Sequence, residues 1–131
     1  MKTVKLEETL PYSASQIWAV IGDVTRSDWM PSVENITEAD GVRTMVMTGI
    51  GEVQEKILLH DSAAYFLQYS VIKTPATIEH HHSTIKLSSM GEQCHVSWTT
   101  EIAPDQLAPA MEQEMKASLE GLKQLLAGGS K

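Results

Sequence analysis

The sequence predicts an α+β fold, in which an antiparallel β-sheet of about seven strands packs against one long C-terminal α-helix. Two observations support this prediction. Segments of alternating apolar and polar residues, separated by tight turns, follow one another from residue 33 to residue 102, and strands joined by short turns pair antiparallel. Residues 104–126 then carry apolar side chains at every third or fourth position, which is the period of a helix.

The long C-terminal helix is predicted to begin at Pro104, which a helix tolerates in its first turn, and to end at Gly128 and Gly129. At ~1.5 Å per residue it would be roughly 33 Å long and would need a wide apolar partner, which the strands can supply. Its apolar face carries Leu107, Met111, Met115, Leu119, Leu122 and Leu126. The opposite face, which we expect to be solvated, carries Glu112, Glu114, Lys116, Glu120, Lys123 and Gln124.

Two short helices are predicted between the first strand, at residues 4–10, and the second. Ser13 and Gln16 have the spacing of a capping box, which covers free backbone N–H groups at the start of a helix that runs to about residue 22. A second short helix is predicted over residues 23–30, ended by Pro31. The remaining strands are predicted at residues 33–38, 42–48, 52–60, 64–72, 78–88 and 93–102.

Composition and charge narrow the class of protein. A chain of 131 residues is predicted to form one domain, 1–131, which is large enough for a real core. The net charge of −7 argues against nucleic-acid binding, and no apolar run reaches the ~20 residues of a membrane span. The single cysteine, Cys94, excludes an internal disulfide and fits the reducing cytoplasm. We expect no cofactor, and the sequence carries no signal for an oligomeric state.

Strand parity places several polar side chains on the surface that faces the helix, because alternate residues of a strand point to opposite faces. In residues 52–60, for example, Glu55 shares the more apolar face with Ile57 and Leu59. An isolated buried charge is costly, a pair lowers that cost, and a solvated cavity lowers it further. The pattern therefore indicates an incompletely filled space under the helix. The polar residues predicted to face it are Arg43, Glu55, Tyr69 and His81.

Several short motifs follow one another in order along nearly the whole chain. They are Ser15-x-x-Ile17-Trp18, Asp23-x5-Trp29-x-Pro31-x-Val33, Gly41-x-Arg43, Glu55-Lys56-x-Leu58-x-x-Asp61, Tyr69-Ser-Val and Val96-x-Trp98. Together they resemble the START/Bet v 1-like superfamily (SRPBCC, polyketide cyclase/dehydrase-type). The resemblance implies a helix-grip fold, in which a curved antiparallel sheet wraps around a long C-terminal helix. It also implies a cavity between them for lipids, sterols, polyketides or other apolar molecules.

Within this superfamily, Arg43, Glu55 and Tyr69 look most like the plant lachrymatory factor synthase branch. In that branch an Arg and a Glu on the two matching strands line the cavity and carry out a proton-transfer rearrangement. This chain departs from the pattern, because its hairpin between Arg43 and Glu55 is shorter and it lacks the glycine-rich loop of plant Bet v 1 proteins. The specific reaction is therefore not carried over. The superfamily also contains lipid carriers, quinone-binding proteins, hormone receptors and chaperone activators.

We expect a protein that binds a small apolar or amphipathic molecule, lipid-, polyketide- or isoprenoid-like, between sheet and helix. The alternative is a cyclase, dehydratase or isomerase in which Glu55 is the acid/base and Arg43 stabilises developing charge. A second alternative, a protein-interaction module, would require a filled interior and an exposed apolar patch. The expected ligand-binding residues are Tyr69, His81, Met45, Met47, Ile57, Trp29, Trp98, Met111, Met115 and Leu119.

Three further features have structural explanations. The adjacent residues His80, His81 and His82 alternate across a strand, so no more than two share a face, and no metal site is expected. The resemblance places Trp29 near the cavity entrance, whereas packing in the core is the simpler interpretation. Cys94 has no partner histidine at a motif spacing, so we expect a buried thiol rather than a nucleophile.

Overall fold

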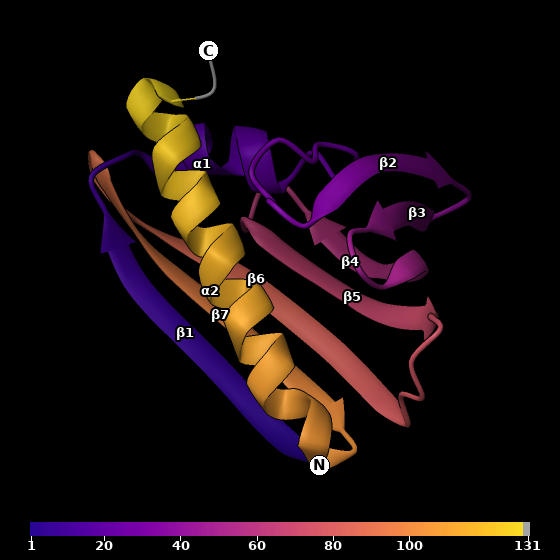
Figure 1. Ribbon diagram of the computed structural model, residues 1–131. Coiled ribbons are helices and arrows are strands. Elements are labelled where there is room, and N and C mark those ends of the chain that lie inside the picture. The colour runs from indigo at the N-terminus through magenta and orange to yellow at the C-terminus, as the bar shows by residue number, and fades with distance from the viewer. Residues whose placement is uncertain (130–131) are drawn as a thin grey trace.

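Residues 1–129, which the computed structural model describes, form a seven-stranded antiparallel sheet with a long C-terminal helix lying across it, as predicted (Figure 1). The strand order is β1-β7-β6-β5-β4-β3-β2, so β1 and β2 are the edges. The strands are β1 (Lys2–Leu10), β2 (Val33–Ala39), β3 (Val42–Met47), β4 (Gly51–Asp61), β5 (Phe66–Lys73), β6 (His80–Met90) and β7 (Gln93–Ala103). The helical segments are α1 (Ala14–Ile21), the 3₁₀ turn η1 (Asp105–Leu107), α2 (Ala108–Gln124) and the π-helical turn η2 (Leu125–Gly129).

The capping box predicted at the start of α1 is present. Ser13 Oγ accepts a hydrogen bond from the backbone N–H of Gln16, and the Gln16 side chain accepts one from the backbone N–H of Ser13 at 2.9 Å. Two otherwise free N–H groups are thereby satisfied, which fixes where the helix begins. The face that α1 buries against the sheet consists of Ala14, Ile17, Val20 and Ile21.

The prediction of a second short helix over residues 23–30 is wrong, because this segment forms turns. Asp23 Oδ1 accepts hydrogen bonds from the backbone N–H and the hydroxyl of Thr25, a local pattern that competes with helix formation. The Val24 carbonyl, which would accept a helical hydrogen bond, accepts one from Arg43 instead. A tertiary contact therefore uses the backbone group that a helix would need.

The predicted C-terminal helix is confirmed, with a tighter first turn. Pro104 precedes η1, and α2 carries Pro109 in its own first turn. At the other end Gly128 has a φ of 88°, a left-handed conformation that glycine adopts without strain. Gly121 serves a different purpose, because a Cβ there would collide with the carbonyl oxygen of Trp29. Glycine thus lets α2 approach the segment that follows α1.

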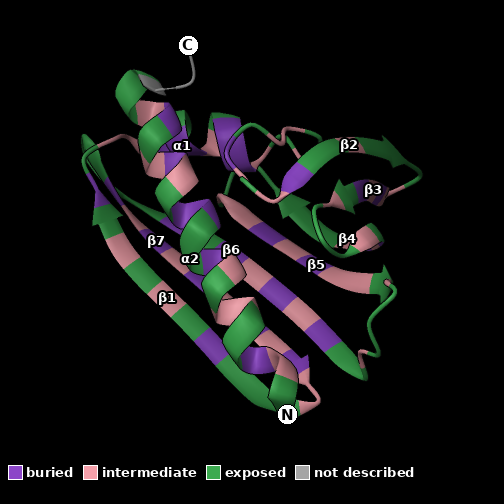
Figure 2. Cartoon of the chain, viewed as in Figure 1, coloured by how far each residue is buried: buried purple, intermediate pink, exposed green. Residues whose placement is uncertain are grey.

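Side chains alternate between the two faces over most of the sheet, and β4 contains an exception to the prediction (Figure 2). Leu59 is predicted to face the helix, but it is 43% exposed. The pairing of β4 with β5 shifts register between Ile57 and Leu59, so that Leu59 pairs with Gln68, which alternation places on the outer face. A β-bulge of this kind adds one residue to a strand and reverses the alternation beyond it.

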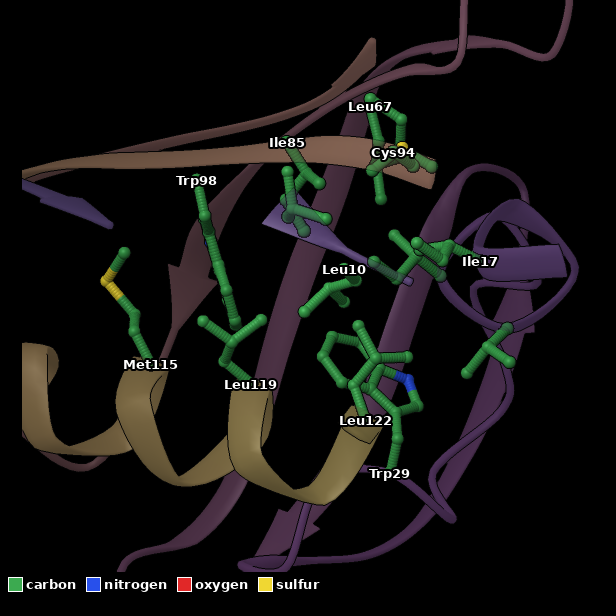
Figure 3. Packing of buried hydrophobic residues seen from close by; sticks show 14 of the residues in the cluster. Leu10, Ile17, Trp29, Leu67, Ile85, Cys94, Trp98, Met115, Leu119 and Leu122 are labelled. Atoms are coloured by element: carbon green, nitrogen blue, oxygen red, sulfur yellow. The ribbon is translucent and has the colours of Figure 1, made fainter. Parts of the chain in front are cut away.

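The core has a large part and a small part. The large part lies between α1, the second half of α2 and strands β1, β5, β6 and β7. Figure 3 shows Met115, Leu119 and Leu122 extending from α2 toward the sheet. The small part, under β2 to β4, consists of Val33, Met45 and Val53. No helix within residues 1–129 is long and apolar enough to cross a lipid bilayer.

Candidate functional site

A cavity of about 210 Å³ lies between the first half of α2 and the inner faces of strands β3 to β7. Its wall is mainly apolar, and methionines supply much of it, from β3 and from α2. Arg43 and Glu55 are the charged residues of the wall that are fully buried. An apolar space with a few polar groups is the usual construction of a small-molecule site.

The cavity lies where two neighbouring strands separate. β5 pairs with β6 from Phe66 to Tyr69, and the regular pairing ends there. Beyond that point His81 of β6 holds the strands together, because its Nδ1 accepts a hydrogen bond from the backbone N–H of Val71 at 3.1 Å and its carbonyl accepts one from the Ser70 hydroxyl. The two backbones therefore diverge while a side chain bridges them, and Val71 lines the space that opens.

Arg43 of β3 and Glu55 of β4 form a buried ion pair in the cavity wall. They stand directly opposite each other in the sheet, Arg43 Nε lies 2.7 Å from Glu55 Oε1, and the two residues are only 5% and 8% exposed. Arg43 Nη1 also donates to the Val24 carbonyl at 3.1 Å, and the guanidinium lies 4.7 Å from the centre of the Tyr69 ring. The cation is thus held by a carboxylate, a carbonyl and an aromatic face.

Tyr69 is buried beside this pair and keeps its phenolic proton at neutral pH. Burial and, second, the Glu55 carboxylate raise the pKa of Tyr69 to about 12, while Arg43 acts in the opposite direction. The Trp98 indole lies close enough to lower that pKa slightly. The indole N–H does not form a hydrogen bond, however. Trp98 Nε1 is the one fully buried side-chain N or O atom without a partner in residues 1–129.

His81 is a neutral imidazole whose proton we assign to Nε2. Its Nδ1 accepts a hydrogen bond from Val71, so that nitrogen is unprotonated. Burial lowers the pKa of His81. The Glu55 carboxylate opposes this effect, whereas the neighbouring His80 and His82 lower the pKa further. The His81 ring centre lies 6.0 Å from that of Tyr69. Within the described residues neither His81 Nε2 nor Glu55 Oε2 has a hydrogen-bond partner, so both remain available to a ligand.

The cavity opens between the β3–β4 turn, the loop after β5 and the first turns of α2. Ile50 in the turn is 45% exposed, and the wall residues Ala76 of the loop and Ala110 of α2 are exposed as well. At the same rim Glu114 of α2 accepts a hydrogen bond from the Ser32 hydroxyl at 2.8 Å, which ties the helix to the segment before β2. The exposed alanines leave the rim open.

The structure brings most of the predicted site residues together in the cavity wall and leaves three outside it. Trp29 and Leu119 belong to the filled core, and Ile57 packs against that core from β4. The resemblance places Trp29 at an entrance, but in the structure it is 5% exposed and does not line the cavity. The predicted residues within the wall are Arg43, Glu55, Tyr69, His81, Met45, Met47, Trp98, Met111 and Met115.

Several wall residues escape prediction from the sequence. Glu114 is predicted on the solvated face of the helix but is half-buried and lines the cavity. It lies three residues after Met111 and four before Ser118, and residues at that spacing share one side of a helix. That spacing could have identified it. Loop and turn residues follow no such period; those missed in the wall are Met30, Ile50, Thr74, Ala76 and Ile78.

Residues 1–129 contain no group of three or more His, Cys, Asp or Glu side chains arranged to hold a metal ion. The three adjacent histidines divide between the faces of β6, as predicted. His81 is buried at the cavity, whereas His80 is exposed and its Nε2 lies 3.0 Å from Glu101 Oε1. Beside Arg43, the polar side chains that Glu55, Tyr69 and His81 contribute to the cavity wall are a carboxylate, a phenol and an imidazole.

Solved structures with this fold share little sequence with the chain. The protein XoxI from Bacillus cereus superposes with a TM-score of 0.88 at 19% identity, over 97% of this chain and 96% of that one. ZhuI aromatase/cyclase from Streptomyces sp. R1128 has a TM-score of 0.81 at 18% identity, over 96% and 93%. Truncated norcoclaurine synthase from Thalictrum flavum has a TM-score of 0.74 at 20% identity, over 95% and 92%. These likenesses confirm the helix-grip fold of START/Bet v 1-like proteins.

Sequence comparison shows the family. Curated proteins give no significant match to the chain. A family model described as "Polyketide cyclase / dehydrase and lipid transport" matches residues 1–127. The match covers nearly the whole sequence, including every strand and both α-helices. The chain therefore belongs to the polyketide cyclase/dehydrase and lipid transport family.

Proposed function

We propose that the protein binds a small apolar or amphipathic molecule in the cavity between α2 and the sheet. The observation that carries this proposal is an open cavity with mainly apolar walls, in which the polar groups of Arg43, Glu55, Tyr69 and His81 are gathered on neighbouring strands. Ligand apolar surface would be buried at roughly 25 cal/mol per Å², and the polar groups would orient the oxygen-bearing end. We place the protein in the cytoplasm, because its single cysteine suits a reducing compartment.

The size of the cavity limits the ligand. A cavity of about 150 Å³ in a protein core accommodates benzene, so 210 Å³ suits one or two fused rings, or a chain of similar volume. Methionine side chains are flexible and polarisable, and they adapt to ligands of irregular shape. A larger lipid- or polyketide-like molecule would have to extend through the open rim. The methionines of the wall are Met30, Met45, Met47, Met111 and Met115.

Fluorescence titration with N-phenyl-1-naphthylamine, an uncharged dye that becomes bright in apolar surroundings, tests this proposal. The wild-type protein should give saturable binding. Ala110→Trp places a large ring at the rim and should weaken binding at least about tenfold, or 1.4 kcal/mol. Ala117→Trp is the matched control, because Ala117 is exposed on the same helix and does not line the cavity. Absence of saturable binding, or equal binding by both variants, would contradict the proposal.

One observation favours catalysis as a second candidate function. Glu55 Oε2 is free beside an apolar space, where it could remove a proton from a carbon next to a ligand carbonyl, with Arg43 or Tyr69 stabilising the resulting oxyanion. This arrangement supports a cyclase, dehydratase or isomerase. A protein-interaction module gains no such support, because it would need a filled interior.

Exchange of the methyl protons of 2-acetylnaphthalene for deuterium, followed by NMR in D₂O, tests for the proton transfer. A catalytic Glu55 should accelerate exchange in the wild-type protein, and Glu55→Gln should return the rate to that of buffer. A matched control is Glu52→Gln, because Glu52 is exposed on the same strand. If all three proteins exchange at the rate of buffer, the protein binds without performing this chemistry.

A further inference from the structure

We infer that the cavity selects uncharged, oxygen-bearing ring compounds against carboxylates, and that Glu55 is the residue that enforces this selection. The ligand class meant is a phenol or an aryl ketone of one or two rings. The inference rests on the proposed binding function and deepens it by naming the chemistry of the ligand.

The positive charge of Arg43 is already matched inside the protein. Its Nε binds Glu55 Oε1 at 2.7 Å, its Nη1 binds the Val24 carbonyl at 3.1 Å, and its face lies on the Tyr69 ring. A guanidinium that is free in a cavity would attract a carboxylate. A guanidinium paired in this way presents little net charge to a ligand, so it gives a carboxylate no compensation for leaving water.

Negative charge dominates the rest of the wall. Glu55 bonds Arg43 Nε through Oε1 alone, and Glu114 adds a second carboxylate at the rim, where its partner is the uncharged hydroxyl of Ser32. His81 contributes no positive charge, because burial keeps its imidazole neutral. The whole chain carries a net charge of −7, which also repels anions. An anionic ligand is therefore opposed at the rim and inside.

An uncharged oxygen finds complementary partners in the same place. His81 Nε2–H can donate to a carbonyl or hydroxyl oxygen, because Nδ1 is occupied by the backbone N–H of Val71. Tyr69 keeps its proton and can donate as well, while Glu55 Oε2 can accept from a ligand hydroxyl. Buried polar groups favour ligands that pair with them, since a group left unpaired loses its hydration without compensation.

Three probes of matched shape test the inference by competition with N-phenyl-1-naphthylamine. They are 2-acetylnaphthalene, 2-naphthol and 2-naphthoate, of which only the last is charged at neutral pH. The wild-type protein should bind the two uncharged probes and should bind 2-naphthoate at least about tenfold more weakly, because a charge repelled in a partly buried site is costly. Equal or tighter binding of 2-naphthoate would overturn the inference.

The role of Glu55 is tested by Glu55→Gln, which removes the charge and leaves Arg43 free to attract an anion. Affinity for 2-naphthoate should rise about tenfold, and affinity for 2-acetylnaphthalene should change much less. Glu52→Gln should change neither, because Glu52 is exposed on the same strand and pairs loosely with Lys73 at 3.7 Å. If Glu55→Gln fails to fold, Arg43→Met is compared with Arg43→Met/Glu55→Gln. No gain for 2-naphthoate on removing Glu55 would overturn its role.

The outcomes separate this inference from the proposed function. If the dye and all three naphthalenes fail to bind, the binding function itself is wrong and the inference fails with it. If the three probes bind alike, binding stands and the selection against charge is wrong. If 2-naphthoate alone is rejected by the wild-type protein and regains affinity when Glu55 is replaced, both stand.

Discussion

One helix covers two halves of the sheet that are built differently. On one side β1, β7 and β6 pair along their full length without a register shift, and the core above them is filled. On the other side the β2–β3 and β4–β5 pairings both shift register, and β5 leaves β6 after four residues. The cavity lies over this irregular side, and its wall also takes His81 from β6 and Trp98, Thr100 and Ile102 from β7. Regular pairing thus accompanies close packing, and broken pairing accompanies open space.

The side chains of α2 follow the same division. Its second half supplies leucines that fill the core, among them Leu119 and Leu122. Its first half presents Ala110, Met111 and Glu114, which are too small, too flexible or too polar to fill the space beneath them. We infer that the filled half provides the stability that lets the other half keep a cavity and two buried charges.

The largest expected effect compares truncations in the two halves. Leu122 is fully buried, so Leu122→Ala should lower the free energy of unfolding by about 3 kcal/mol, as large-to-small changes in filled cores do. Met111 is half-buried beside the cavity, and Met111→Ala should cost less than about 1 kcal/mol because fewer contacts are lost. Urea unfolding measures both. Equal losses would mean that the two halves are packed alike.

An intermediate effect is expected for the buried charges. Arg43→Met leaves the Glu55 carboxylate without a partner in the wall of an open cavity, where water can reach it, and it should lower the free energy of unfolding by about 2 kcal/mol, less than in a dry core. Adding Glu55→Gln removes the unpaired charge, so the double variant should recover about half of that loss. A double-mutant cycle in urea measures the coupling. If the two changes are additive, Arg43 and Glu55 are not energetically coupled. The stability of the filled half would then not be needed to offset the cost of burying them as a pair.

Much of this fold could be predicted because alternation and helical period are local properties of the sequence. They place the buried residues of β6 and β7 correctly, and in α2 they identify Met115, Leu119 and Leu122. The incorrect predictions occur where a contact with a distant part of the chain determines the local structure. At Asp23 a local turn competes with a helix, and Arg43 takes the Val24 carbonyl that a helix would need. Leu59 faces outward because β4 gains a residue relative to β5, and the alternation of the sequence does not reveal such a bulge.

The candidate site could be predicted in part for the same reason. Parity places Arg43, Glu55, Tyr69 and His81 on the inner face, and all four are buried there. The position of the opening could not be predicted, because it depends on where β5 separates from β6. That separation is stabilised by His81 bonding a backbone N–H across the gap, and a polar residue at an inward position does not reveal which group it will bond.

The smallest expected effect concerns the residue at the boundary between the two halves. Burial lowers the pKa of His81 below 6.5, its ordinary value, while the Glu55 carboxylate opposes this and His80 and His82 add to it. As the pH falls through 6.5 the unfolded chain takes up a proton before the folded protein does. The contribution of His81 to the free energy of unfolding is therefore fully present above that pH. It is lost progressively below that pH, until His81 is protonated in the folded protein as well.

His81→Asn should remove this part of the pH dependence, because an amide oxygen can still accept from Val71 but does not titrate. Urea unfolding at about pH 7.5 and about pH 5.5 should show a larger loss of stability for the wild-type protein than for His81→Asn. His82→Asn is the control, because His82 lies on the opposite face of β6 and contributes only a minor part of the His81 pKa shift, so this variant should retain most of the wild-type dependence. If wild type and His81→Asn lose stability equally, the imidazole does not hold the separated strands as a neutral acceptor, and the boundary between the filled and open halves is maintained by packing alone.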